Sequence, residues 1–343
     1  LGGFLVDQLS WRWVFYVNII PGLLAAALVA LAWRDTLHGH GRPVVDYAGA
    51  GLLTVAVVTL LLGLMEYGTS ISWILIFASV ALFIILLWVE SRAADPILPL
   101  HLFRERLFAV STLHGILTGW AMFGSISFIP LFVQSVLGTS ATQAGITIAP
   151  MLLGWVGASI IGTRLLLRVG YRRLAILGTS LLVIGAFLMS RVDANINQTL
   201  LMFYVTLMGI GMGFSIPPFL IAVQTTVERR YLGTATSTMQ FSRSIGGTLG
   251  VSVMGAALSA RLAANLTTSG LNPELVSQLL DPISSTQTVI DQGVRIAVAN
   301  AINLVFVIAF VAALLGLVAT FFAPRKELKE NQMESEPVMV SAD

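Results

Sequence analysis

The chain of 343 residues contains no cysteine, and only 10% of its residues are charged. Without cysteine it can form neither disulfide bonds nor thiolate metal sites. Because 56% of the residues are hydrophobic, so few charges cannot keep the apolar surface in water, which excludes a soluble globular fold. The net charge is only +2 and follows the membrane loops, so we do not expect nucleic acid as a partner.

Catalytic and nucleotide-binding motifs are also missing. The sequence has no HExxH, GxSxG or GxxxxGK[ST] pattern, and the last absence excludes an ATP-driven pump domain within this chain. A membrane enzyme would need a cluster of His, Asp or Glu at one membrane face, and none is visible. We therefore predict that the chain is not an enzyme and that it uses no metal and no cofactor.

Nine long apolar stretches dominate what is present. A bilayer core of ~30 Å requires roughly 20 apolar residues in a helix, whose backbone groups then bond within the segment. The predicted fold is therefore all-α, a polytopic transmembrane helical bundle with about nine spans in the lipid bilayer. The stretches cover residues 11–33, 46–65, 70–90, 107–133, 143–166, 172–190, 199–221, 233–260 and 295–323.

The basic residues predict how these helices are oriented. If the 34–45 loop is inside and the loops alternate, fourteen of the 19 Lys and Arg residues lie inside, and Arg243 lies within a stretch. Because basic loops stay in the cytoplasm, we predict a multi-pass protein of the plasma (inner) membrane with a cytoplasmic C-terminus and Leu1 at the outer surface. The inside set is Arg34, Arg42, Arg92, Arg104, Arg106, Arg164, Arg168, Arg172, Arg173, Arg229, Arg230, Arg325, Lys326 and Lys329, and the outside set is Arg12, Arg191, Arg261 and Arg295.

The spacing of the stretches divides the chain into four parts. An odd number of spans that begins outside leads us to expect a missing N-terminal portion. The outer connection at 261–294 is the one long loop, and the helices at 46–90 are expected to lie peripherally and face lipid. The four parts are residues 1–33, the end of a first bundle; 34–106, a two-helix insert with flanking cytoplasmic loops; 107–323, a six-helix bundle; and 324–343, a polar cytoplasmic tail.

Small residues and prolines recur inside the spans. Small residues one turn apart let helix backbones approach closely. Prolines remove backbone donors and favour kinks, which suits helices that line a cavity, although structural packing alone explains each glycine equally well. The small residues that share faces are Gly154, Ala158 and Gly162, then Gly209 and Gly213, then Gly246 and Gly250, and the prolines are Pro130, Pro150, Pro217 and Pro218.

Several motifs together resemble a known family. Leu1-Gly2-Gly3-Phe4-Leu5 is similar to the end of the antiporter signature of major facilitator drug exporters, a fifth-helix motif ending Gly-Pro-x-x-Gly-Gly-x-Leu. The run Trp11-Arg12-Trp13-Val14-Phe15-Tyr16-Val17-Asn18, followed by Pro21-Gly22, resembles the opening of helix six in the fourteen-helix drug:proton antiporters of the EmrB/QacA type. Weaker matches are Asp46-Tyr47-x-Gly49, Ala149-Pro150, Gly209-x-Gly211-x-Gly213 and Arg243-x-x-Gly246-Gly247-x-x-Gly250.

This resemblance implies a major facilitator fold for an N-terminally truncated chain. Residues 1–33 would be the end of helix five and helix six, with Gly2 and Gly3 as the remnant of the antiporter motif. The pair at 46–90 would be the two helices that separate this subfamily from twelve-helix relatives. The resemblance also implies that a proton gradient, rather than a cofactor, drives transport.

One loop resembles the family's gate loop but departs from it. The stretch from Gly162 to Arg173 is similar to Gly-x-x-x-Asp-Arg-x-Gly-Arg-Arg, with Leu167 in the place of the acid. The acid-based gate is therefore doubtful in this half, and we expect the proton-coupling acids upstream. The residues that carry this resemblance are Arg164, Arg168, Gly170, Arg172 and Arg173.

Two titratable or charged residues inside spans are candidates for the substrate or proton pathway. Arg243 lies about ten residues into its span, where a charge costs roughly 2.5–3.5 kcal/mol and needs a partner or a water-filled cavity. It could bind an anionic or polar substrate group, or it could hydrogen-bond carbonyls at a helix break. His114 could carry a proton, since the pKa of His is near neutrality, or it could be a hydrogen-bonded packing residue.

Other pathway candidates are apolar or amide side chains. Trp120, Met122 and Phe123 suit a promiscuous apolar cavity, but they are equally at home facing lipid, and the sequence does not fix the rotation of their helix. The amides could line a pathway or hold helices together, and the second role is the more common one. These amides are Gln224, Gln240, Asn300 and Asn303.

The function that these observations favour is proton-driven efflux of small, amphipathic compounds by alternating access. A major facilitator importer of a nutrient or metabolite is the first alternative, and a polytopic membrane enzyme or assembly factor is the second. The expected partners are the bilayer and small-molecule substrates. Whether accessory export proteins take part is left open.

Overall fold

The computed structural model describes residues 2–32, 46–66, 68–93, 96–98, 100–268 and 292–325. These residues are helical apart from short connections, and nine of their helical segments are long and apolar enough to cross a membrane. The prediction of an all-α protein with nine spans is confirmed. The elements are α1 (Gly2–Gln8), α2 (Trp13–Tyr16), α3 (Ile19–Ala32), α4 (Tyr47–Met65), α5 (Ser70–Glu90), η1 (Leu102–Arg104), α6 (Arg106–Ser135), α7 (Ala141–Val169), α8 (Tyr171–Met189), α9 (Gln198–Thr226), η2 (Arg229–Tyr231), α10 (Leu232–Thr268) and α12 (Gln292–Phe321).

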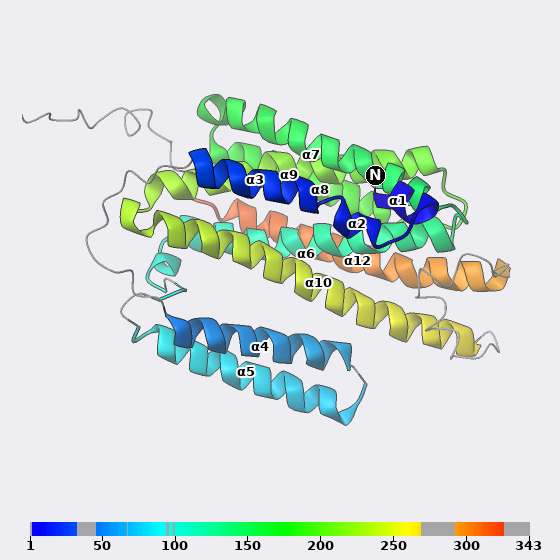
Figure 1. Cartoon of the computed structure of the whole chain (residues 1–343), viewed down its shortest axis with the longest axis horizontal. Helices are drawn as coiled ribbons and strands as arrows, with labels where there is room; N and C mark the ends of the chain where they lie inside the picture. The colour runs from blue at the N-terminus through cyan, green and yellow to red at the C-terminus, as the bar shows by residue number, and fades with distance from the viewer. Residues whose placement is uncertain are drawn as a thin grey trace, which may run out of the picture.

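The six long helices from α6 to α12 form one bundle with their axes roughly along the same direction (Figure 1). Within it α9 packs between α7 and α8, while α6 packs against α10 and α12. The two groups are joined where α8 contacts α12 and where α6 contacts α7 and α9. Helices that are neighbours in the chain are therefore not always neighbours in space, and α6 and α10 meet although their residues are far apart in the sequence.

Glycines allow the helices to approach one another closely. A Cβ on Gly246 of α10 would overlap the backbone of Ile116 of α6, and a Cβ on Gly119 of α6 would overlap the backbone of Arg243. On α9, Gly209 meets the backbone of Met151 of α7 in the same way. Since lipid gives helices no hydrophobic reason to associate, such close packing is a main source of bundle stability.

The helices α4 and α5 form a separate hairpin. Its contact side repeats every seven residues, with buried Gly49, Ala56 and Gly63 on α4 facing Ser72 and Ser79 on α5. Ser72 donates a hydrogen bond to the carbonyl of Gly63 (2.7 Å), and Ser79 donates one to the carbonyl of Ala56 (2.8 Å). The hairpin lies beside α10, which α4 contacts, and apart from the rest of the bundle (Figure 1), and it exposes large apolar side chains such as Ile74 and Phe77.

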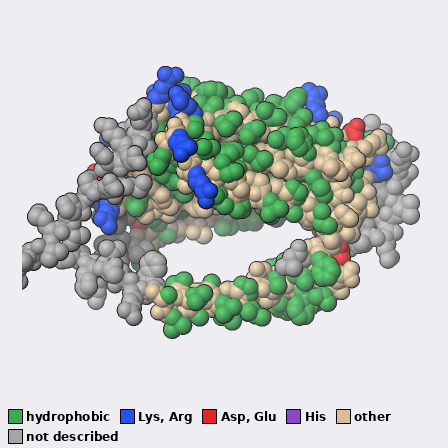
Figure 2. Space-filling view, turned by 90° about the horizontal axis from the view of Figure 1, so that it is seen from above, with side chains coloured by type: hydrophobic (Ala, Val, Ile, Leu, Met, Phe, Trp, Pro, Cys, Tyr) green, Lys and Arg blue, Asp and Glu red, His purple; other side chains and the backbone are tan. Residues whose placement is uncertain are grey.

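The first segment, residues 2–32, meets the bundle through α1, which contacts α7, while its apolar span Trp13–Ala32 is exposed and stands away from the bundle (Figure 2). The predicted span at 11–33 is divided at Val17 and Asn18 into α2 and α3. Pro21 has no N–H to donate to the carbonyl of Val17. The backbone N–H of Asn18 donates to the carbonyl of Phe15 (3.1 Å), and its side chain donates to the carbonyl of Val14 (2.8 Å).

Helix ends differ from the prediction at several places. The span expected to end at residue 260 continues as α10 to Thr268, so the outer connection begins eight residues later than predicted. The prolines at 130, 150, 217 and 218 lie inside continuous helices.

Some predicted segments lie outside the described residues. They are the predicted inner loop at 34–45, the centre of the predicted outer loop at 269–291, the tail from 326, and Leu1.

Candidate functional site

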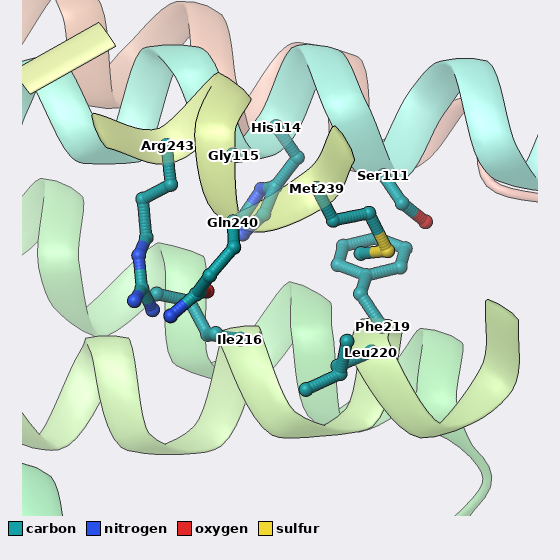
Figure 3. Close-up of a pocket in the computed structure, with 9 residues that line it drawn as sticks. All are labelled: Ser111, His114, Gly115, Ile216, Phe219, Leu220, Met239, Gln240 and Arg243. Atoms are coloured by element: carbon teal, nitrogen blue, oxygen red, sulfur yellow. The ribbon is translucent and has the colours of Figure 1, made fainter. Parts of the chain in front are cut away.

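A pocket lies inside the six-helix bundle, between α6, α9 and α10 (Figure 3). Its cavity volume is small, about 20 Å³, and the surrounding space not filled by atoms, part of it open to solvent, is about 330 Å³. His114 lies eight residues from Arg106, the first residue of α6, which at 1.5 Å per residue is a depth of about 12 Å. We call this the inner pocket because the N-terminal end of α6 is predicted to be cytoplasmic. The lining residues are Ser111, His114, Gly115, Ile216, Phe219, Leu220, Met239, Gln240 and Arg243.

His114 is buried, and its two ring nitrogens differ. Nδ1 lies 3.0 Å from the hydroxyl of Thr320 on α12, and that hydroxyl is placed to donate to the carbonyl of Gly316 (2.8 Å). A threonine hydroxyl has one hydrogen, so when it donates to Gly316 it accepts from Nδ1–H, and that tautomer of His114 has its lone pair on Nε2. Nε2 is buried without a hydrogen-bond partner among the described residues. The ring also packs on Phe219 of α9, with centroids 4.8 Å apart.

Arg243 brings the charge to this pocket. It is half-buried on α10, and its Nε has no hydrogen-bond partner among the described residues. Its guanidinium carbon lies 5.8 Å from the ring centroid of Trp155 on α7, at the edge of cation–π range. Among the residues that the structure describes, none lining the pocket is acidic, so the arginine faces a cavity rather than a neutralising carboxylate.

The remaining walls combine two polar side chains with an apolar surface. Ser111 lies one turn below His114 on α6, and its buried hydroxyl has no hydrogen-bond partner among the described residues. Gln240 is exposed and lies one turn from Arg243 on α10, and Figure 3 shows both side chains extending toward α9. The sequence prediction missed Ser111, because a lone serine in an apolar helix carries no signal of its own.

Three of the nine predicted pathway residues, namely Arg243, His114 and Gln240, therefore share one pocket. The aromatic candidates lie elsewhere on α6: Trp120 packs on Gly250 and Phe123 on Gly247, both on α10. Met122 is fully buried in the core of the bundle. None of these three residues lines the inner pocket, because they face the contact between helices.

The other amides connect helices or lie at the surface. Gln224 donates to the hydroxyl of Thr236 (3.1 Å) and so joins the inner ends of α9 and α10. Asn303 donates to the carbonyls of Ser190 (2.9 Å) and Val192 (3.0 Å), which follow the last turn of α8. Asn300 is exposed. Gln224 and Asn303 thus hold helices together, which is the second of the two roles weighed above.

The gate-loop residues surround the turn between α7 and α8. Gly170 links the two helices with φ of 83°, a backbone conformation that favours glycine. Arg172 donates to the carbonyl of Phe321 (2.9 Å), and Arg106 donates to that of Phe322 (2.8 Å). Both arginines thus bind the C-terminal carbonyls of α12, where the helix dipole favours positive charge. The side chains of Arg164, Arg168 and Arg173 are exposed.

Gly2 and Gly3 lie at the other end of the bundle. Gly3 packs so closely on the backbone of Ala141 that a Cβ would overlap it, whereas Gly2 has no such neighbour. Four residues later Asp7 accepts hydrogen bonds from the backbone N–H (2.8 Å) and hydroxyl (2.5 Å) of Thr142. The hydroxyl bond, helped by the backbone bonds, holds the pKa of Asp7 below its usual value despite some desolvation. The sequence analysis did not single out Asp7.

A second cavity lies between the C-terminal half of α6 and α10, in the half of the bundle predicted to be the outer one. Its cavity volume is about 340 Å³, larger than that of the inner pocket, and it is more open. Its walls include Phe128, Gln134 and Ser259, and among the described residues none of them is charged. The inner and outer cavities share the α6–α10 boundary, and the closely packed glycines lie between them.

Comparisons with known proteins agree with this architecture. The model of the Major Facilitator Superfamily matches residues 1–251. The chain is 36% identical over 286 residues to "Multidrug transporter protein MdtP" of Bacillus subtilis (strain 168), covering 81% of this chain and 52% of that protein. It is 30% identical over 349 residues to "Multidrug resistance protein 3" of the same organism, covering 96% of this chain and 68% of that protein. The chain thus spans about half the length of MdtP.

One solved structure shares the fold. It is a bacterial homolog to the human lysosomal transporter Spinster, in an inward-facing and occupied conformation. The superposition has a TM-score of 0.52 and covers 81% of this chain and 68% of that one. At 18% sequence identity the likeness concerns the fold alone.

Proposed function

The chain belongs to the major facilitator superfamily, and we propose that it serves the proton-driven efflux of small amphipathic compounds, drugs among them. The two relatives named above are called a multidrug transporter and a multidrug resistance protein, which supports drugs as the substrate class. The fourteen-helix organisation, with 46–90 as an insert, belongs to the same proposal.

The observation that carries this proposal is the inner pocket. It places a few polar groups, led by Arg243 and His114, in an apolar wall within a membrane-spanning bundle. Its cavity of about 20 Å³ must widen during the transport cycle before it can hold both the polar head and the apolar body of an amphipathic molecule. Its depth of about 12 Å from the inner end of α6 suits a substrate taken up from the cytoplasmic side.

Proton coupling requires a titratable group in the membrane, and His114 is the group that this bundle offers. The six helices from α6 to α12 contain no Asp or Glu within their described bounds. His114 has a free Nε2 facing the pocket, so it can accept a proton where substrate binds. Further coupling acids are proposed to lie outside this bundle.

The proposal includes the place and orientation of the protein. Positive loops predict the plasma (inner) membrane with the C-terminus in the cytoplasm. Alternating access then exposes the inner pocket to the cytoplasm in one state and to the outside in the other.

Transport by inside-out membrane vesicles tests the function. Vesicles carrying the protein should accumulate a fluorescent amphipathic drug when their interior is acidified, because export by the cell corresponds to uptake by an inverted vesicle. An ionophore that exchanges protons for potassium should stop the accumulation. Vesicles without the protein are the control for passive partition.

Two outcomes contradict the proposal in different ways. Accumulation that persists after the proton gradient is collapsed would rule out proton coupling and leave efflux standing. Movement of the compound only out of inverted vesicles would identify an importer, which is the alternative left open by the sequence.

A further inference from the structure

We propose that the inner pocket binds the acidic group of an amphipathic weak acid, so that the protein exports lipophilic acids in preference to lipophilic cations. This inference rests on the proposed function and names the substrate class of the same site. Three observations carry it: the sign of the charge in the pocket, the state of His114, and the apolar wall opposite them.

The formal charge that the described residues bring to the pocket is positive. Arg243 supplies a permanent positive charge, and no acidic residue lines the pocket in the part of the chain that the structure describes. The nearby aromatic ring of Trp155 lies at the edge of cation–π range and does not neutralise that charge. Because charges interact strongly where water is scarce, an anion gains energy beside this guanidinium and a cation loses it.

The polar atoms that lack partners match an acid group. Arg243 has donors only, and the Thr320 hydroxyl fixes His114 so that Nε2 is an acceptor. A weak acid supplies both counterparts, an oxygen for the guanidinium and an acidic hydrogen for Nε2. The acidic hydrogen then lies between the acid oxygen and Nε2 of His114. The hydrogen bond is O–H···N when the acid carries the proton and O···H–N when His114 carries it. The Ser111 hydroxyl, also buried and unpaired among the described residues, can donate to the second oxygen.

The apolar wall accommodates the rest of such a molecule. Ile216, Phe219 and Leu220 come from α9, and Met239 comes from α10. Figure 3 shows the phenyl ring and the methionine side chain beside the polar group formed by Ser111 and His114. Aromatic and Met side chains adapt to varied apolar shapes, so the acid group is expected to set the specificity.

Two fluorescent probes with the same ring system test the proposal: 9-anthracenecarboxylic acid and 9-(aminomethyl)anthracene. Uptake of each is measured in acid-loaded inside-out vesicles that carry the full protein, and uptake by vesicles without the protein is subtracted, because a lipophilic amine accumulates passively in an acidic interior. We expect the acid to be transported at least about tenfold faster than the amine at equal concentration, since a like charge beside Arg243 costs more than the corresponding 1.4 kcal/mol.

Arg243→Gln removes the positive charge and keeps a polar side chain at this position. It should reduce transport of the acid and remove the preference over the amine, with rates normalised to folded protein. Arg261→Gln, the same change at an exposed position near the outer end of α10, is the matched control and should keep the preference. If Arg243→Gln does not fold, Ser111→Ala should still weaken transport of the acid more than that of the amine.

The outcomes distinguish this proposal from the function on which it rests. Equal transport of both probes, or faster transport of the amine, overturns the preference for acids but leaves efflux intact. Failure of the acid, the amine and a neutral amphipathic drug to move with the proton gradient overturns the proposed function itself. A preference for the acid that survives in Arg243→Gln places its source outside this pocket and overturns the proposal.

Discussion

Asp7 of the first segment accepts two hydrogen bonds from Thr142, at distances of 2.8 and 2.5 Å from the backbone N–H and the hydroxyl. The two residues are 135 positions apart, and the contact joins α1 to the first turn of α7. A carboxylate at this place also faces the positive end of the dipole of α7. Together with the close approach of Gly3 to Ala141, it fixes the first segment against the six-helix bundle at its outer end.

Removing this carboxylate should weaken the contact in a pH-dependent way. The pKa of Asp7 is lowered in the folded protein, so its contribution is full above the unfolded value of about 3.9 and is lost as pH falls through the folded value. We expect Asp7→Ala to lower the thermal midpoint in detergent at pH 7, and the difference from the wild type to disappear well below pH ~4.

Asp7→Asn is the matched variant for that experiment. It keeps an oxygen acceptor for Thr142 but carries no charge, so its deficit at pH 7 should be smaller than that of Asp7→Ala and should also shrink towards pH 3, a range of roughly three units above and one below the usual Asp pKa. An equal loss for Asp7→Ala at both ends of this range would mean that the carboxylate charge is irrelevant to the contact.

The hydrogen bond between Thr320 and His114 should matter for both stability and transport. Thr320→Val keeps the shape but removes the oxygen that accepts from Nδ1, which leaves a buried donor unpaired at a cost of about 1–3 kcal/mol. Without this partner His114 can adopt the other tautomer, so drug efflux per folded molecule should also fall. Thr320→Ser keeps the hydroxyl and should retain most of both properties, whereas wild-type stability and efflux in Thr320→Val would show that the hydrogen bond contributes to neither.

Close packing of α6 and α10 should make two glycines sensitive to the smallest substitution. Gly119→Ala and Gly246→Ala each place a methyl group against the backbone of the facing helix, so we expect a loss of about 1–3 kcal/mol or a sharp fall in detergent-stable protein. Gly233→Ala, at a helical position with nothing near the added methyl group, is the control. Similar yields for all three variants would argue against the helix contact.

The sequence was sufficient for the number and type of the spans, because a bilayer accepts only long apolar helices. It was less accurate at helix ends, as α10 shows. Residues Ala264 to Thr268 are polar enough to resemble a loop, yet they continue the helix, and Asn265 donates to the carbonyl of Ala297 on α12 (3.2 Å). A contact between helices overrides the local composition there.

The candidate site was only partly predictable for a similar reason. The cost of burying a charge identified Arg243 and its depth in the span. It does not give the rotation of α10, which places the Arg243 side chain in a pocket beside His114. The partners of Arg172 and Arg106 are backbone carbonyls of α12, which any sequence could supply. Asp7 was not singled out, because its partner Thr142 lies far along the chain.

Cysteine labelling tests the orientation, and the absence of native cysteine makes each introduced thiol unique. Arg168 is exposed near the C-terminal end of α7, and Arg191 is exposed just after the C-terminal end of α8. Because a short turn joins the two helices, these residues lie at opposite ends of the helix pair, and Arg168→Cys and Arg191→Cys form a matched pair. An impermeant maleimide added to intact cells should label residue 191, whereas residue 168 should react only after permeabilisation. Labelling of residue 168 from outside would falsify the orientation and, with it, the cytoplasmic C-terminus.

Arg243 offers the sharpest separation between a pathway residue and a structural one. Its Nε has no hydrogen-bond partner among the described residues, so little should be lost from the fold when the side chain is shortened. We therefore expect Arg243→Ala to abolish drug efflux with normal amounts of detergent-stable protein. Arg243→Lys keeps the charge but loses the planar fork of donors, and should leave partial activity. A structural arginine would give the opposite pattern, in which Arg243→Ala lowers the amount of folded protein while efflux per folded molecule equals that of the wild type.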